Sequence, residues 1–492
     1  MLNSLIRLVV VISVAGLRPY DIETYSSSIG DNGFKRLMEQ SAYYNPNAIC
    51  NYMTTSPAAF YATMTTGATP NMHGIVGSQF YSIVDNGVIS CIDDARYPGI
   101  NTNATVSPRL IGANTITDQL KALYPNSKVY TIATNPESAI MMGGHLGDAA
   151  VWIDTASMEY ATSTYYEMGL PKWAMQANTN RYLRQAMATP WKPAVNISLY
   201  HYPAKTINFW NEARPTFLNM DKAYNFMHSP MVNEQITKLA IRAIRDDLLG
   251  TDESPDMVML EYTLNTPFGT TRSAEVEDAF IRLDQDITSL LNAIDISVGL
   301  GNTLIVLTAP PTEAETIRHE RLSYPEFNND RSMALLNSYL MALYGQGQWV
   351  NTYYNRQIYL NHTLIDNMSV PLDEIQDKVA AFMLEFSTIQ TATAAHTLAM
   401  PASANGMDIT SRMANSIYKH RSGDVILTLR PGATDKQSQV PASYTPIRFP
   451  LLIYAPDHEL RNPEQFMLVE LCPTLSRLLC IPAPHAASRI GI

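Results

Sequence analysis

The sequence predicts an α/β protein built on a mainly parallel sheet with helices on both faces. Short apolar runs alternate along the chain with amphipathic segments, which is the pattern of βαβ units. The first run, Leu-Val-Val-Val-Ile-Ser-Val at residues 8–14, is apolar almost throughout, as expected of a strand buried on both faces. The chain has 492 residues, more than the roughly 250–300 at which one core stops growing, so a second lobe is expected.

Each core element is assigned from its own apolar pattern. Residues 33–39 have helical spacing and would form the first crossover helix, and the segment from Asn114 would form a later one. The expected core strands are residues 8–14, 128–133, 257–262, 303–307 and 450–454. In an open sheet of this kind ligands bind beyond the carboxyl ends of the strands, so the residues just after each strand are the candidate site.

Two segments interrupt this series and are expected to fold as an inserted cap or second lobe. Residues 155–245 are rich in aromatic residues, Asn and Met, and residues 320–435 contain helices and strands of their own. The α/β core would then consist of residues 1–154, 246–319 and 436–492.

The composition excludes some classes of protein. With 34 basic and 45 acidic residues the formal net charge is −11, and nucleic-acid binding depends on clustered Lys and Arg. The apolar run at residues 8–17 is too short to span a membrane and is followed by no small-residue cleavage site. We therefore expect neither a nucleic-acid-binding nor an integral membrane protein.

The four cysteines are too few for a disulfide scaffold. Cys50 and Cys91 could form one disulfide in an exported protein, or they could be two buried thiols. Cys472 and Cys480 are eight residues apart in an expected helix. That spacing is about 12 Å along a helix axis, too far for a disulfide.

Several segments carry a family resemblance through their order and spacing. Among them are Thr-Gly-Ala-Thr-Pro-Asn-Met-His-Gly-Ile at residues 66–75 and Gly-His-Leu-Gly-Asp-Ala-Ala-Val-Trp-Ile-Asp at 144–154. Others lie at residues 33–37, 163–166, 170–173, 276–286, 422–425, 450–454 and 472–475. Together they resemble the alkaline phosphatase superfamily, most closely the phosphate-irrepressible alkaline phosphatases of the nucleotide pyrophosphatase/phosphodiesterase-like branch.

The resemblance implies an alkaline-phosphatase-like fold with an inserted cap and a location outside the cytoplasm, in the periplasm or beyond. It also implies two zinc ions and a Thr or Ser nucleophile. This chain lacks the zinc ligands at the matching positions. Ala15 stands where the first strand should end in a metal-binding Asp, and Tyr262 and Thr266 stand in an Asp-x-x-x-His pair. Pro310 and Pro311 replace a further Asp-His pair, and residues 436–444 contain no His where the last one is expected.

The nucleophile and the phosphate-holding residues are missing as well. Pro57 falls on the nucleophile, and a proline side chain has neither a hydroxyl nor a lone pair. Ser78 stands in place of an Asn, while Asn135 and Glu137 replace a Lys-x-Arg pair. Glu137 would repel a phosphate dianion. We therefore expect no family zinc and no other cofactor.

Some nearby residues carry alternative readings. His73 and His145 are interpreted as turn or helix-start residues rather than catalytic groups. Thr55 and Ser56 are the nearest hydroxyls to Pro57, but a hydroxyl without a base or a metal is inert. The aromatic residues of 160–210 could form a binding surface, with core packing as the simpler reading.

The sequence thus favours a catalytically inactive family member with a binding, scaffold or regulatory role and a protein partner. A variant of this hypothesis is a subunit of an envelope assembly. The alternative is a divergent metal-dependent phosphatase or phosphodiesterase with a relocated metal site. That site would use Glu261, Glu313, His319 or Asp435.

Overall fold

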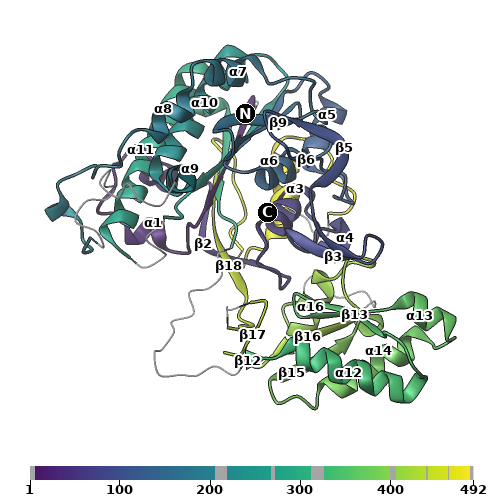
Figure 1. The fold of residues 1–492 in the computed structure, drawn as a ribbon. Helices are drawn as coiled ribbons and strands as arrows, with labels where there is room; N and C mark the ends of the chain where they lie inside the picture. The colour runs from purple at the N-terminus through teal and green to yellow at the C-terminus, as the bar shows by residue number, and fades with distance from the viewer. Residues whose placement is uncertain are drawn as a thin grey trace.

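A ten-stranded sheet organises the larger part of the molecule (Figure 1). The computed structural model describes residues 6–204, 219–266, 272–311, 326–398, 406–438, 441–463, 465–487 and 491–492. In spatial order the strands are β2 (Tyr43–Cys50), β18 (Ile447–Tyr454), β11 (Thr303–Thr308), β1 (Leu8–Ala15), β10 (Asp256–Thr263), β7 (Val129–Ala133), β8 (Ala149–Asp154), β9 (Glu159–Ser163), β5 (Asp93–Ile100) and β6 (Thr105–Val106).

The five central strands, from β11 to β8, run parallel, and the outer strands are antiparallel. This confirms the predicted fold class and the five expected core strands, although β18 is antiparallel to its neighbours. In β1 successive side chains enter opposite clusters. Val10 and Ile12 pack on one face of the sheet and Val9 and Val11 on the other. Burial on both faces explains why the run is apolar without alternation.

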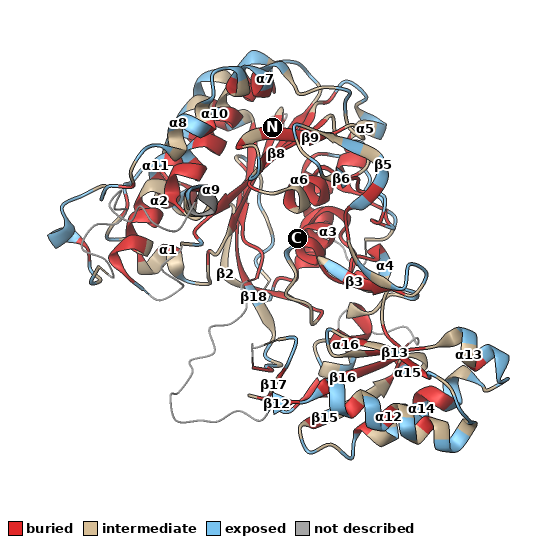
Figure 2. Cartoon of the chain, viewed as in Figure 1, coloured by how far each residue is buried: buried red, intermediate tan, exposed pale blue. Residues whose placement is uncertain are grey.

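Helices cover both faces (Figure 2). One face packs against α1 (Asp21–Thr24), α2 (Phe34–Glu39), α7 (Lys172–Thr179), α8 (Tyr182–Met187), α9 (Asn219–Met227), α10 (Pro230–Asp246) and α11 (Ala274–Ser297). The other packs against α3 (Pro57–Thr66), α5 (Ile116–Leu123), α6 (Pro136–Gly143) and α17 (Leu471–Leu478). Short elements at the rim are α4 (Pro70–His73), β3 (Gln79–Ser82), β4 (Gly87–Ser90), η1 (Ile197–Leu199), η2 (Leu300–Asn302) and η3 (Leu468–Glu470).

Among the described residues of segment 155–245, several large aromatic side chains belong to the core, while residues 205–210 of the predicted aromatic cluster lie outside the described residues. Tyr160, Trp173 and Trp191 are each 1% exposed and belong to the same buried cluster as β1 and β10. The core reading of these side chains is therefore confirmed. The boundaries predicted for this insertion stay a prediction.

A smaller lobe is built on the antiparallel sheet β13 (Val350–Tyr354), β14 (Gln357–Leu360), β16 (Val425–Leu429) and β15 (Ile389–Ala394), in that spatial order. Its helices are α12 (Asn329–Tyr344), α13 (His362–Asn367), α14 (Leu372–Met383), α15 (Ala395–Leu398) and α16 (Ile409–Ser416). A two-stranded ladder of β12 (Glu326–Phe327) and β17 (Thr434–Asp435) lies beside it. This lobe has its own buried cluster around Trp349.

Arg421 of the smaller lobe joins it to the larger one. Its Nη1 donates to the carbonyls of Gly74 (2.6 Å) and Leu110 (2.7 Å), and its guanidinium stacks on the ring of Phe80. Tyr359 and Tyr81 meet edge to face across the same boundary. The two lobes are thus connected by buried polar and aromatic contacts.

The described cysteines are free thiols, so Cys50 and Cys91 are two buried thiols rather than a disulfide. Among the described helices, none has the length and apolar character needed to cross a membrane.

Candidate functional site

The candidate site lies at the carboxyl ends of the central strands. Ala15 ends β1 and is paired with Thr263 of β10. Pro310 and Pro311 follow β11 and are buried. Parallel strands end at the same edge of the sheet, so the structure brings these three positions to one edge. None of these three side chains carries a metal-binding atom.

The N-terminus of α6 supplies the next part. Asn135 is the N-cap of α6, and its side chain accepts a hydrogen bond from the backbone N–H of Ser138. An amide or hydroxyl in this position satisfies an N–H that has no partner inside the helix. The cap places Glu137 in the first turn, where the helix dipole favours a negative charge.

Ser78 and Glu137 are in direct contact. Ser78 Oγ donates to Glu137 Oε1 at 3.0 Å, and Ser56 Oγ lies 3.0 Å from Ser78 Oγ. Cys91 Sγ approaches the other carboxylate oxygen at 3.9 Å. Burial raises the pKa of Glu137, the Ser78 hydrogen bond opposes this shift, and the nearby charge of Glu261 adds to it. Ser78 and Glu137, two of the positions expected to bind a phosphate, are therefore hydrogen-bonded to each other.

Glu261 forms a second buried carboxylate centre beside the first. It accepts hydrogen bonds from Thr134 Oγ1 (2.7 Å), the Thr134 N–H (3.0 Å), Ser138 Oγ (2.7 Å) and Asn135 Nδ2 (3.0 Å). Tyr61 OH donates to it at 3.4 Å and also lies 3.0 Å from Ser13 Oγ. Burial raises the pKa of Glu261, and these donors oppose the shift. The carboxylate is thus surrounded by donors of the protein itself.

The structure does not bring Tyr262 to this cluster. Side chains alternate along β10, so Glu261 faces α6 while Tyr262 packs on the opposite face of the sheet. Tyr262 OH lies 2.9 Å from Thr237 Oγ1 of α10. The match of motifs pointed to Tyr262, but the residue on the site's face is Glu261. Strand alternation shows that Glu261 and Tyr262 point to opposite faces of the sheet. It does not show which of the two faces carries Asn135, because that depends on the pairing of β10 with β7.

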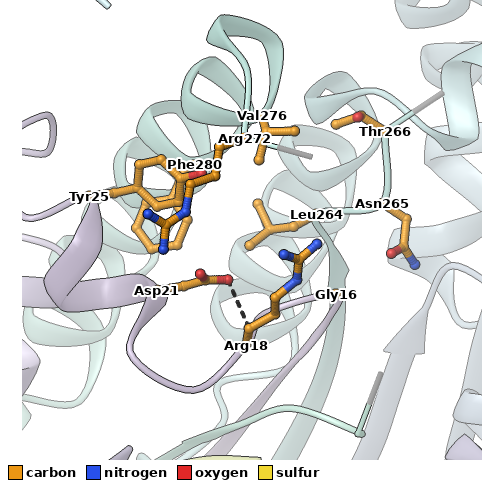
Figure 3. Close-up of a pocket in the computed structure, with 10 residues that line it drawn as sticks. All are labelled: Gly16, Arg18, Asp21, Tyr25, Leu264, Asn265, Thr266, Arg272, Val276 and Phe280. Atoms are coloured by element: carbon orange, nitrogen blue, oxygen red, sulfur yellow. Dashed lines mark hydrogen bonds between the residues drawn. The ribbon is translucent and has the colours of Figure 1, made fainter. Parts of the chain in front are cut away.

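A small cavity of about 80 Å³ lies beside this edge, lined by Gly16 and Thr266 among others. Figure 3 shows the side chains of Arg18 and Arg272 on either side of Asp21, below the ring of Phe280. Asp21 Oδ2 accepts the backbone N–H of Arg18 at 2.9 Å, and burial raises the pKa of Asp21. Gly16 has φ +88°, and a Cβ there would meet Asn265 Oδ1 at 2.7 Å. This close approach explains why glycine follows Ala15.

The two histidines have structural partners. His73 is fully buried, its Nδ1 accepts the Ile75 N–H (3.1 Å), and its Nε2 lies 3.0 Å from Thr63 Oγ1. Burial, helped by the charge of Arg421, lowers the pKa of His73 to about 3, so the ring is neutral. His145 bridges Asp118 Oδ2 (2.9 Å) and the Ile111 carbonyl (3.1 Å). Both therefore hold turns in place.

Of the four residues proposed for a relocated metal site, the two that the structure describes lie on different sheets, Glu261 in β10 and Asp435 in β17. Asp435 lies in β17 beside the smaller lobe, where it accepts hydrogen bonds from Arg356 Nε (3.0 Å) and the Ser438 N–H (2.8 Å). Glu313 and His319 lie outside the described residues. Within the described ranges, no group of three or more His, Cys, Asp and Glu side chains is arranged to hold a metal ion. The residues expected at the family's zinc positions, Ala15, Tyr262, Thr266, Pro310 and Pro311, include no Cys, His, Asp or Glu, the side chains that bind zinc in proteins.

Comparisons with known proteins agree with this fold. The alkaline phosphatase PafA of Elizabethkingia meningoseptica is 26% identical over 98% of this chain and 93% of its own length. A calcium-transporting ATPase of Myroides odoratus is 27% identical over 97% of the chain and 92% of its own length. The crystal structure of PafA superposes with a TM-score of 0.82 at 23% identity, covering 99% of this chain and 98% of that one.

A family model described as type I phosphodiesterase / nucleotide pyrophosphatase matches residues 9–442. The chain therefore belongs to the type I phosphodiesterase/nucleotide pyrophosphatase family, within the alkaline phosphatase superfamily.

Proposed function

We propose that this protein is a catalytically inactive member of its family that acts by binding, as a scaffold or regulatory protein outside the cytoplasm. One observation carries the proposal. Glu137 stands where an arginine is expected to hold the substrate phosphate, and its carboxylate is bound by Ser78, the neighbouring phosphate-holding position. A phosphate dianion entering here would meet a carboxyl group in place of a guanidinium, which supplies no positive charge and repels the anion when it is ionised.

The losses act on independent parts of the reaction. Family hydrolases combine a metal Lewis acid with an activated nucleophile, and enzymes accelerate reactions by about 10⁶-fold or more through such contributions. Pro57, at the nucleophile position, is the first residue of α3 and has no hydroxyl. Ala15 and Pro310 offer no ligand at the metal positions. A chain without the metal ligands and without the nucleophile has lost both of the groups that lower the activation barrier of hydrolysis.

Ser56 is tested separately because its hydroxyl is connected to an acid through the hydroxyl of Ser78. Its hydroxyl lies 3.0 Å from Ser78 Oγ, which donates to Glu137. This chain of hydroxyls ends on a carboxylate that also repels phosphate. We therefore expect Ser56→Ala to change no phosphatase activity, and a loss of turnover in this variant would identify Ser56 as a nucleophile.

The deciding experiment combines metal content with turnover. Protein purified without chelators is analysed for zinc by mass spectrometry, and hydrolysis of an aryl phosphate monoester and diester is measured beside PafA as the active control. We expect less than one zinc per chain and no hydrolysis above the blank. About two zinc ions per chain with turnover that a chelator abolishes would overturn the proposal. The search for ligands would then begin at Glu261, Glu313, His319 and Asp435.

The first candidate ligand for the proposed binding role is another protein. A pull-down from the envelope fraction with the full chain, analysed by size-exclusion chromatography, tests this part separately. A stoichiometric complex with one envelope protein supports the scaffold role. Recovery of the protein without any partner contradicts the scaffold role, whatever the result of the metal analysis.

A further inference from the structure

A loop of the larger lobe, residues 191–201, presents apolar side chains to solvent. We call this segment the tip loop. Val195, Ile197 and Leu199 are 36%, 46% and 67% exposed and alternate with exposed polar residues. In Figure 2 the loop extends outward at the left edge of the larger lobe and is coloured as exposed. Aliphatic side chains gathered on one exposed turn, unlike single ones scattered over a surface, indicate an interaction site.

Buried carboxylates of α11 hold both ends of the tip loop. At the first end, Asp278 accepts hydrogen bonds from Trp191 Nε1 (2.5 Å) and the Ala194 N–H (2.6 Å). At the second end, Glu277 accepts the His201 N–H (2.9 Å). Glu277 and Asp278 are 1% and 0% exposed, and hydrogen bonds to a carboxylate are stronger than those between neutral groups. The ends of the loop are thus fixed, and the apolar side chains between them stay directed to solvent.

The basic side chains that contact the tip loop reach the surface, whereas the acids that hold it are buried. Lys192 of the loop and Arg272 of the larger lobe are exposed. Arg272 Nη1 donates to the OH of Tyr202, the residue after the loop (3.3 Å). Arg282 is paired with Asp278, but its side chain is 30% exposed and its Nη2 donates to the Lys192 carbonyl (2.6 Å). The surface beside the apolar tip therefore carries cations.

The sequence around the tip loop lacks acidic residues. Residues 168–204, which include α7, α8 and the tip loop, contain four Lys and Arg residues and no Asp or Glu. The chain as a whole has 45 acidic and 34 basic residues. This segment therefore has the opposite charge to the chain, as expected of a surface that approaches anions.

Shape distinguishes a lipid bilayer from a protein partner. Stable protein interfaces bury about 800 Å² on each side and are enriched in aromatic residues at their centre. The tip loop instead offers three aliphatic side chains on a short turn, with cations beside them. Proteins that bind a membrane surface combine these two features, because apolar side chains enter the headgroup region and cations contact anionic headgroups.

We propose that the tip loop binds the surface of an anionic lipid bilayer. Val195, Ile197 and Leu199 insert among the headgroups, and Lys192 and Arg272 lie beside the lipid phosphates. Attachment of this kind is weak and reversible, because few side chains enter the bilayer. The proposal does not depend on the loss of catalysis at the candidate site. It adds a surface that brings the protein to a membrane.

The test uses the full chain with vesicles of phosphatidylcholine alone or mixed with phosphatidylglycerol, and co-sedimentation measures binding. Leu199→Asp places a charge on the tip. Ile296→Asp makes the same kind of change at an 88% exposed position near the other end of α11. We expect wild type and Ile296→Asp to bind the mixed vesicles. Leu199→Asp should lose about tenfold or more of this affinity, because it removes an apolar side chain that enters the bilayer.

Two further variants separate charge from insertion. Lys192→Gln should lower the affinity for mixed vesicles about fivefold, the contribution of one cation near an anionic surface. Lys378→Gln, at an exposed position of the smaller lobe, is the matched control. Leu199→Trp adds an indole whose emission, relative to wild type, should shift to shorter wavelength with mixed vesicles. Ile296→Trp should give no such shift.

Far-UV circular dichroism checks that each variant is folded. Absence of binding to mixed vesicles, equal binding to both kinds of vesicle, or an equal loss in Leu199→Asp and Ile296→Asp would overturn the proposal. The tip loop would instead be a protein contact if vesicles do not bind and Leu199→Asp loses a protein that wild type recovers from the envelope fraction. That outcome would also refute the lipid assignment.

Discussion

Glu137 shows how one side chain changes the character of a site. At this position the family resemblance predicts a cation for the substrate phosphate. The carboxylate found here is partly buried, accepts a hydrogen bond from Ser78 and lies close enough to Glu261 for the charge of Glu261 to raise its pKa. An acidic side chain therefore stands at the position where the family resemblance predicts a group that binds an anion.

We expect Glu137→Gln to be at least as stable as wild type at neutral pH. Burial raises the pKa of Glu137 above the unfolded value of 4.5, so the folded chain binds this proton more tightly than the unfolded chain. The stability that Glu137 contributes is present below the unfolded pKa and is lost as the pH rises through the folded pKa. Gln keeps the oxygen that accepts from Ser78 but does not titrate.

Urea unfolding at mildly acidic and at neutral pH measures this. The free energy of unfolding of wild type, relative to the variant, should fall as the pH rises. A difference that is independent of pH would contradict the assignment. Glu253→Gln, at an exposed position, is the matched control and should show no such trend.

At the scale of elements, α11 organises one face of the larger lobe through buried carboxylates. Asp278 accepts hydrogen bonds from Trp191 Nε1 (2.5 Å), the Ala194 N–H (2.6 Å) and Tyr200 OH (2.7 Å). Asp284 accepts those of the Gly30 and Phe34 N–H groups. Two loops far apart in sequence are thus attached to one helix.

Asp278→Ala should lower the free energy of unfolding by about 3 kcal/mol, because it leaves buried donors unpaired. The emission of Trp191 should shift as its indole N–H loses its acceptor. Chemical unfolding followed by fluorescence measures both effects. The control is Gln285→Ala on the exposed side of α11. A loss no larger than that of Gln285→Ala would contradict the assignment, because Ala favours a helix more than either Asp or Gln and helix propensity alone would stabilise both variants.

His145 connects the start of α5 to the loop before it. Its protonation makes the stability of the fold depend on pH. Burial lowers its pKa, but the hydrogen bond and charge of Asp118 outweigh this, so the pKa of His145 is raised above 6.5. The stabilisation is therefore present below the unfolded pKa and is lost as the pH rises through the folded pKa.

We expect His145→Gln to destabilise the protein most below pH 6.5, the unfolded reference value, and least at alkaline pH. Thermal unfolding across this range provides the measurement. His485→Gln, which replaces an exposed histidine, is the matched control. A larger loss for His145→Gln at alkaline pH would reverse the predicted sign.

At the scale of the whole molecule, Arg421 makes one of the contacts between the lobes, beside the hydrogen bonds of Asn415 and Ser416 to the larger lobe. Its guanidinium donates to two carbonyls of the larger lobe and stacks on the rings of Phe80 and Tyr418. Burial lowers the pKa of Arg421, since a desolvated cation is disfavoured. The carbonyls and rings compensate this cost only while the lobes are docked.

Arg421→Ala should therefore loosen the lobes from each other while each keeps its own core. We expect faster proteolysis between the lobes and a separate unfolding transition for the smaller lobe, whose buried cluster is independent. Limited proteolysis and calorimetry measure these effects. Arg430→Ala, at an exposed position of the smaller lobe, is the control. A single unchanged transition in Arg421→Ala would show that other contacts fix the lobes.

The sequence by itself determined the fold class and the core strands, whereas the match of its residues to the family's catalytic positions stays a prediction. A strand buried on both faces is apolar throughout, which is a local property that can be read without a structure. A missing side-chain group is equally local. Pro57 lacks a hydroxyl, and Ala15 and Pro310 lack ligand atoms, in any tertiary setting.

The tertiary structure decided how the remaining polar groups are used. Glu261 finds its donors at Thr134 and Ser138, 127 and 123 residues away, so no local pattern reveals them. It also decided that Tyr262 faces away from Glu261 and its donors and that Tyr160, Trp173 and Trp191 are buried. The tip loop is likewise held by α11, a segment that it meets only in the folded chain. Partners of buried polar groups come from whichever elements pack against them, and packing is a property of the whole chain.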